Sequence, residues 1–169
     1  MRVLGVDPGL NVTGYGIIDS DKKGLRLVEA GVVRTSPKSP LGTRLKKVYT
    51  ALSELIDETR PEVVVLEKLY SHYKHPTTAI LMGHVRGAIS LLAEDKCLPL
   101  AGYGNTRIKK AVIGKGSAQK DRLGRMVEMV LGLKTTPKYN DITDALALAI
   151  AHVRITETDH ILITAGKKI

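Results

Sequence analysis

The sequence predicts an α/β domain in which helices cover the faces of a mixed β-sheet. Three segments rich in strand-forming residues open the chain, and short turns between them favour antiparallel pairing. An apolar run at residues 63–66 and several amphipathic helical patterns then alternate along the rest of the chain. The 169 residues suffice for one domain with a substantial core, which we place at residues 1–155, followed by a tail over residues 156–169.

The three opening strands are expected at residues 2–7, 13–19 and 25–35. The first is a short apolar run that ends in a turn-forming Asp-Pro-Gly tripeptide. The second and third are separated by the turn Asp21-Lys22-Lys23-Gly24, so the two strands should form a hairpin.

Helical periodicity begins at residues 41–59, where apolar side chains recur at three- and four-residue intervals and Pro61 follows. The fourth strand is expected at residues 62–67, and its unbroken apolar run is typical of a central strand covered on both faces. Further helices are expected at residues 75–95, 106–113, 118–131 and 141–154, and a short strand at residues 97–101. From residue 155 onward the sequence has no clear period.

Composition favours a nucleic-acid partner. Lys and Arg total 26 against 17 Asp and Glu, a formal charge of +9 that attracts polyanions. The single cysteine, Cys97, excludes an internal disulfide and fits a reducing compartment. The apolar start is too short for a signal peptide and no stretch is long enough to span a bilayer, so we expect no membrane role.

Two carboxylates stand at the ends of predicted apolar strands, where a charge is costly unless it is paired. Asp7 ends the first strand and Glu67 ends the fourth. Each also has a simpler interpretation. Asp7 could bond its own backbone in the Asp-Pro-Gly turn, and Glu67 could be a solvated residue at a strand end.

Asp141 and Asp144 open the last predicted helix and, three residues apart, share one helical face. They could simply favour the positive end of the helix, with Asn140 as its N-cap. However, an Ala- and Leu-rich run follows at residues 145–150, which indicates a buried helix whose acids point toward the protein.

Together, the four carboxylates indicate a site for hard divalent cations. Oxygen ligands suit Mg²⁺ or Mn²⁺, whereas zinc usually takes Cys and His ligands in a spacing that this chain lacks. Two such cations would activate water and stabilise the leaving oxygen of a phosphodiester. The sequence therefore predicts metal-dependent hydrolysis of nucleic acid.

Several motifs together resemble the RuvC family of Holliday-junction resolvases, from residue 1 to about residue 154. They are the segment Gly5-Val6-Asp7-Pro8-Gly9-Leu10-Asn11-Val12-Thr13-Gly14-Tyr15-Gly16, the residue Glu67, the pair Arg86-Gly87, the segment Gly114-Lys115-Gly116-Ser117-Ala118-Gln119-Lys120 and the segment Asp141-Ile142-Thr143-Asp144-Ala145-Leu146-Ala147. The resemblance implies an RNase H-like fold with a five-stranded mixed sheet. It also implies a Mg²⁺-dependent crossover junction endodeoxyribonuclease of recombination and repair, with two Mg²⁺ per site and Mn²⁺ as a substitute.

By the same resemblance, the catalytic and metal-ligating residues are Asp7, Glu67, Asp141 and Asp144. The enzyme would be a homodimer in the bacterial cytoplasm that nicks two opposed strands of a four-way junction. It would work with a branch-migration helicase complex of the RuvA and RuvB type. Ala79, Gly83 and Gly87, spaced by four, would lie at the subunit interface, although they could equally pack onto the domain's own sheet.

A basic segment at residues 105–125 holds seven Lys and Arg against one acid. Such a run can be a solvated helix face, but beside a nuclease-like acid set it favours phosphate binding. The resemblance assigns DNA contacts to Lys109 and Lys120, and Lys115 and Arg122 are further candidates. Tyr70, where many family members carry Phe, could stack on an unpaired base.

The sequence bears on three other functions. An actin-like or sugar-kinase phosphate-binding lobe shares the Asp-x-Gly hairpin, but it needs a second lobe for which 169 residues leave no room. An RNase H-like nuclease acting on RNA is compatible with the same basic segment. A catalytically silent junction-binding protein is disfavoured because all four acids are present.

Overall fold

The computed structural model describes residues 1–68, 76–114, 120–135 and 137–166. Within them the strands are β1 (Arg2–Asp7), β2 (Val12–Asp21), β3 (Gly24–Arg34), β4 (Val63–Glu67) and β5 (Leu100–Tyr103). The helices are α1 (Leu41–Thr59), α2 (Pro76–Asp95), α3 (Asn105–Ile113), α4 (Lys120–Leu131) and α5 (Asn140–Gly166).

The five strands form one mixed sheet in the order β3-β2-β1-β4-β5. The first three strands are antiparallel neighbours, whereas β4 pairs parallel to both β1 and β5. The predicted α/β class, the hairpin opening and the five-stranded mixed sheet are all confirmed.

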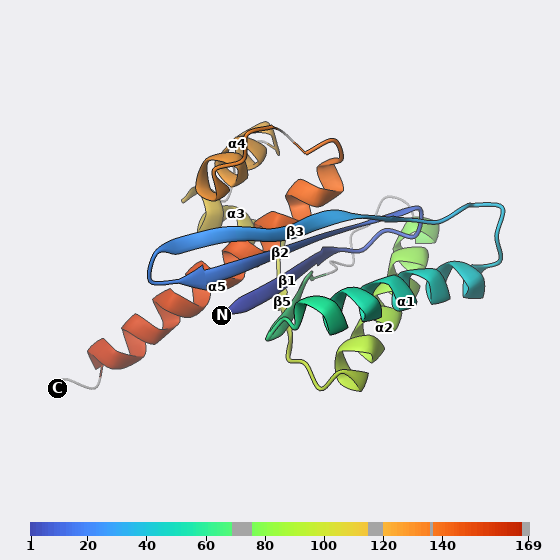
Figure 1. Cartoon of the computed structure of the whole chain (residues 1–169), viewed down its shortest axis with the longest axis horizontal. Helices are drawn as coiled ribbons and strands as arrows, with labels where there is room; N and C mark the ends of the chain where they lie inside the picture. Colours follow the sequence, from blue (N-terminus) through green and yellow to red (C-terminus); the bar gives the residue numbers. More distant parts are fainter. Residues whose placement is uncertain (69–75, 115–119, 136, 167–169) are drawn as a thin grey trace.

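Helices cover both faces of this sheet, as Figure 1 shows, with α1 and α2 on one side and α3, α4 and α5 on the other. Each face has its own apolar core, and the central strand β4 contributes alternate residues to the two. Val63 and Val65 pack with α3, α4 and α5, whereas Val64 and Leu66 pack with α1 and α2. The unbroken apolar run of β4 is explained by this two-sided burial.

Helix α5 lies directly on the sheet because glycines remove side chains beneath it. A Cβ added at Gly5 would overlap the backbone carbonyl oxygen of Ala145 and lie 3.0 Å from the backbone nitrogen of Ala149. At Gly14 it would overlap the backbone of Asp141 and lie 2.8 Å from that residue's Cβ. The first turn of α5, which carries two of the candidate acids, is thereby brought against the ends of β1 and β2.

Two elements differ from their predicted bounds. Strand β5 begins three residues later than expected, because residues 96–98 close the end of α2: the backbone N–H of Leu98 donates to the carbonyl of Ala93 at 2.8 Å, and Cys97 takes a φ of 53°. Helix α5 continues to Gly166, well beyond the predicted end at residue 154. The predicted boundary at residue 155 therefore lies inside one continuous helix.

The extension of α5 is helical without an apolar period. Thr156 and Thr158 donate their hydroxyls to carbonyls of the preceding turn, and Arg154 donates to the carbonyls of Ala111 and Val112 at the end of α3. In Figure 1 the end of α5 extends past the edge of the sheet. Within the described residues, the helices are all too short or too polar to cross a membrane.

A buried polar pair ties β5 to α5. The Tyr103 hydroxyl lies 2.9 Å from Nδ1 of His152, which is 8% exposed, and burial lowers the pKa of His152. The unfolded chain therefore binds a proton more readily than the folded one. As a result, the free energy of unfolding should be greatest above about pH 6.5 and should decrease as the pH falls below that value.

We expect His152→Gln, which cannot titrate, to lose less unfolding free energy than the parent when the pH is lowered from about 7.5 to about 5.5. Urea unfolding at both pH values measures this, and an unchanged pH dependence would contradict it.

Candidate active site

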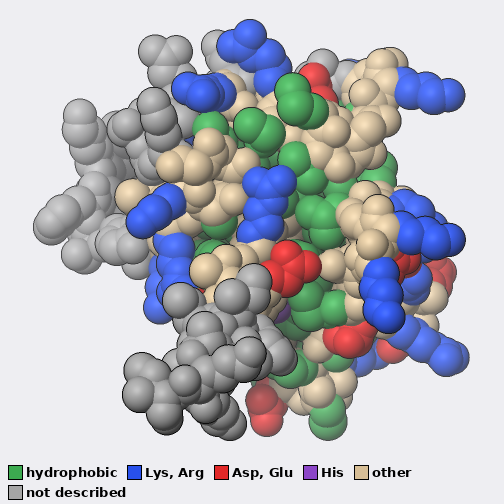
Figure 2. Space-filling model, turned by 90° about the vertical axis from the view of Figure 1, so that its left-hand side faces the viewer, with side chains coloured by type: hydrophobic (Ala, Val, Ile, Leu, Met, Phe, Trp, Pro, Cys, Tyr) green, Lys and Arg blue, Asp and Glu red, His purple; other side chains and the backbone are tan. Residues whose placement is uncertain are grey.

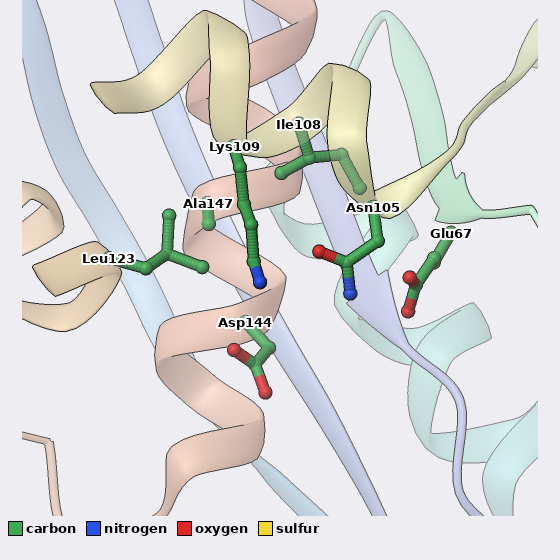
Figure 3. Close-up of a pocket in the computed structure, with 7 residues that line it drawn as sticks. All are labelled: Glu67, Asn105, Ile108, Lys109, Leu123, Asp144 and Ala147. Carbon is green, nitrogen blue, oxygen red and sulfur yellow. The ribbon is translucent and has the colours of Figure 1, made fainter. Parts of the chain in front are cut away.

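A cavity of about 120 Å³ brings two of the predicted acids together. Glu67 enters from the end of β4 and Asp144 from α5, while Asn105 and Lys109 of α3 line the space between them (Figure 3). Its remaining walls are apolar. They are formed by Ile108, Leu123 and Ala147. The cavity therefore holds charged groups against apolar side chains, where electrostatic interactions are stronger than in water.

The position of Glu67 is fixed through its backbone. Glu67 is in register with Tyr103 of β5, and the N–H of Lys68 donates to the carbonyl oxygen of Tyr103 at 2.8 Å. From the other side of the sheet, the Arg86 guanidinium of α2 donates to the carbonyl oxygen of Glu67. The end of β4 is thus held on two sides, with the carboxylate directed into the cavity.

The environment of Glu67 disfavours its charged form. Burial raises the pKa of its carboxyl, and the nearby charge of Asp144 adds to this. The Asn105 side chain hydrogen-bonds to the carboxylate and lowers the pKa, as do the charges of Arg86 and Lys109, but the net direction remains upward. A cation in the cavity would offset both the burial and the repulsion between the two acids.

The other two acids lie at the same end of the sheet. Val6 and Leu66 are parallel neighbours, so Asp7 and Glu67 follow them at the same edge. Asp7 is also in register with Gly14, the residue against which the backbone of Asp141 packs. Sequence positions as distant as 7 and 141 are in this way brought to adjoining elements.

The four acids are not equally placed. Glu67 and Asp144 line the cavity, whereas Asp7 and Asp141, both half-buried, are not among its lining residues. In the part of the chain that the structure describes, no three Asp, Glu, His or Cys side chains are grouped as the ligands of one metal ion. Carboxylates with an amide beside them are nevertheless the donors that hard divalent cations prefer.

The structure describes only some of the candidate DNA-binding residues. Lys109 lines the cavity, and in Figure 3 its side chain extends toward Asp144. Arg122 is exposed on α4. Lys120 begins α4, but its side chain lies outside the described residues, as do Tyr70 and Lys115 entirely. Figure 2 shows Lys and Arg side chains spread around exposed hydrophobic ones on the face that it presents.

Two residues at the site had no predicted role. Arg86 belongs to a motif in the sequence, but nothing in the pattern indicates that it bonds the backbone of Glu67. Asn105 lies two residues after the end of β5, the short strand that neighbours β4. A polar residue just after such a strand is the signal that could have identified it, had the bounds of β5 been predicted correctly.

Comparison with known proteins agrees with this geometry. Residues 3–152 match the family model described as crossover junction endodeoxyribonuclease RuvC. Curated proteins of that name include one from Rhodopirellula baltica, 41% identical over 88% of this chain and 83% of its own length. Another, from Halorhodospira halophila, is 44% identical over 89% of each chain.

Solved structures give the same result. Thermus thermophilus RuvC has a TM-score of 0.87 at 32% identity, covering 94% of this chain and 97% of its own. The same protein in complex with a Holliday junction substrate has a TM-score of 0.86 at 30% identity, covering 94% and 96%. The yeast mitochondrial resolvase Ydc2, with a TM-score of 0.60 at 15% identity, shares the fold over 90% of this chain and 77% of its own.

The fold is therefore that of the RNase H-like resolvases, and the acidic cavity lies at the end of its central strands. The chain belongs to the RuvC family of crossover junction endodeoxyribonucleases.

Proposed function

We propose that this protein resolves four-way (Holliday) DNA junctions by paired, symmetric nicks during homologous recombination and repair. The observation that carries the proposal is the cavity shared by Glu67 and Asp144, in a fold that matches a RuvC captured with its junction substrate. Metal-dependent phosphodiester hydrolysis uses negatively charged ligands to hold the cations, and two acids on separate elements supply such ligands here.

Asp7, Glu67, Asp141 and Asp144 would hold two Mg²⁺ ions, with Mn²⁺ able to substitute. Their all-oxygen chemistry and the upward-shifted pKa of Glu67 support this assignment. When bound, the metals would activate water and stabilise charge on the leaving oxygen. The chain itself orients the Glu67 carboxylate, excludes bulk water with the apolar walls, and offers the Lys109 ammonium to the scissile phosphate.

The DNA would contact the basic side chains near this cavity. Lys109 lines the cavity together with two of the acids, and Arg122 is exposed on α4, where it could reach the DNA backbone. Lys120, Lys115 and Tyr70 complete the proposed surface, the lysines through phosphates and the tyrosine by stacking on an unpaired base.

Helix α2 is the proposed dimer surface. Among the described residues, a Cβ added at Gly83 or Gly87 would meet nothing within 4 Å, so these glycines do not pack on the described sheet. Ile80 on the same helix is 61% exposed. A face that is smooth and partly apolar suits a second copy of the chain, whose own cavity would cut the opposed strand.

The setting proposed for this enzyme is the bacterial cytoplasm. A branch-migration helicase complex of the RuvA and RuvB type would deliver the junction to it. Membership of the RuvC family supports this setting and this partner.

A cleavage assay tests the proposed function. A synthetic four-way junction, a duplex of matched sequence and an RNA/DNA hybrid would each be incubated with the protein in Mg²⁺, in Mn²⁺ and in EDTA. We expect paired nicks in the junction alone, and none in EDTA. Cutting of the hybrid with the junction intact would instead favour a nuclease acting on RNA.

Lys109→Ala and Lys120→Ala should each weaken junction binding and make it less sensitive to salt. Every phosphate contact that is lost lowers the slope of log affinity against log salt concentration by about one. Fluorescence anisotropy between low and moderate salt measures the slope, with Lys22→Ala, in the β2–β3 turn, as a control. If both slopes equal that of the parent, the basic segment is only a solvated helix face.

A further inference from the structure

Glu67 has contacts on both its backbone and its side chain, and they come from different elements. The backbone carbonyl accepts from Arg86 of α2. The carboxylate shares the cavity with the side chain of Asn105, the first residue of α3, and that amide favours the charged form of the carboxylate. In Figure 3 the amide of Asn105 lies between Lys109 and Glu67 and is turned toward the Glu67 carboxylate.

The position of Asn105 is itself tied to the helix that carries Asp144. Asn105 follows Tyr103 by two residues, and the Tyr103 hydroxyl is bonded to His152 of α5 at 2.9 Å. Arg107, in the same first turn of α3, lies over the Tyr103 ring at 5.4 Å from its centroid. The backbone just before Asn105 is thus anchored to α5, and the Asn105 side chain lies in the same cavity as Glu67.

We propose that Asn105 is a positioning residue, whose side-chain amide holds the Glu67 carboxylate facing Asp144 so that the pair is ready to receive a divalent cation. This inference rests on the proposed nuclease function. The Glu67 carboxylate lies beside the like charge of Asp144, and a donor on α3 favours the orientation in which the two acids face one another. A hydrogen-bond donor that fixes a ligand side chain before the metal binds reduces the conformational entropy that this side chain must lose on binding.

The test compares Asn105→Ala and Asn105→Asp with Thr106→Ala. Thr106 is the exposed neighbour on the same turn of α3 and does not line the acidic cavity. For each protein, Mn²⁺ affinity is measured without DNA by electron paramagnetic resonance of free Mn²⁺. Single-turnover junction cleavage is measured across a Mn²⁺ titration, and thermal unfolding is recorded without metal.

Asn105→Ala is expected to weaken Mn²⁺ binding by about 10- to 100-fold and to shift the cleavage titration to higher Mn²⁺ by a similar factor. Its unfolding midpoint should match that of Thr106→Ala, which binds Mn²⁺ and cleaves like the parent. Asn105→Asp keeps the size and the oxygen but cannot donate when ionised, so it should cleave more slowly than the parent even at saturating Mn²⁺.

Three results would overturn the assignment. Parent-like Mn²⁺ affinity in Asn105→Ala would show that Glu67 needs no such support. A lowered unfolding midpoint with unchanged Mn²⁺ affinity would show a purely structural role. Parent-like cleavage by Asn105→Asp would identify the side chain as an oxygen ligand rather than a donor.

If the parent binds Mn²⁺ but cuts no junction, the proposed function fails. The ratio of the Mn²⁺ affinities of the parent and Asn105→Ala would still decide the role of Asn105.

Discussion

Glu67→Gln is expected to abolish junction cleavage while junction binding stays within about twofold of the parent. The substitution keeps the size of the side chain but removes a charge from the cavity that it shares with Asp144. Stabilisation of transition-state charge by a bound metal is worth several kcal/mol, and each 1.4 kcal/mol is tenfold in rate, so the loss should be at least about 100-fold. The same result is expected for Asp144→Asn, Asp7→Asn and Asp141→Asn.

Single-turnover cleavage with saturating enzyme, paired with an electrophoretic binding assay, separates the two effects. Glu94→Gln, an exposed acid near the end of α2, serves as the matched control and should cleave normally. Near-normal turnover by any of the four variants would remove that residue from the metal-ligand set. A variant that loses binding and cleavage together would instead have a folding defect.

Gly5→Ala is expected to have the largest effect on stability. Its new methyl group would overlap the carbonyl oxygen of Ala145, which is backbone and cannot rotate away. Helix α5 would have to lift from the sheet, at a cost at or above the upper end of the roughly 1–3 kcal/mol that overpacking usually carries. Because α5 also carries Asp144, the folded fraction of this variant should cleave poorly as well.

Gly42→Ala provides the matched control for this substitution. Gly42 lies in the first turn of α1, where an added Cβ would meet nothing within 4 Å in the part of the chain that the structure describes, and alanine is the better helix former there. Urea unfolding should show Gly42→Ala equal to or up to about 1 kcal/mol more stable than the parent. A Gly5→Ala variant as stable as the parent would mean that α5 does not rest on β1 at this point.

Most of the fold could be predicted because its signals are local. The apolar run before Glu67, the turn after Asp21 and the three- and four-residue period of α1 each depend on neighbouring residues. The start of β5 was predicted wrongly because its residues are set by pairing: Val64 donates to the carbonyl of Pro99, a contact that the sequence does not reveal. The extension of α5 was also missed, because the sequence of that part of the helix has no apolar period. Its contacts are made instead by Thr hydroxyls and Arg154.

The candidate site was predicted in part. The acids could be named because charge at the end of an apolar strand or on a buried helix is unusual, and the shared cavity of Glu67 and Asp144 agrees with that reasoning. The places of Arg86 and Asn105 beside Glu67 could not be predicted, because they depend on how α2 and α3 pack around the end of β4. Tyr70 and Lys115 lie outside the described residues and remain predictions.

Helix α5 is synthesised long after the strands on which it packs, and this order has a consequence for the nascent protein. Strands β1 and β2 are made first, but the helix that fills the space above Gly5 and Gly14 is made last. A ribosome-bound chain that has reached only residue 139 possesses Asp7 and Glu67 without either acid of α5. On the proposed assignment of Asp141 and Asp144 to the metal site, the nascent protein should not cut DNA until α5 has emerged and docked, and a truncated translation product that ends before α5 should be inert rather than an unregulated nuclease.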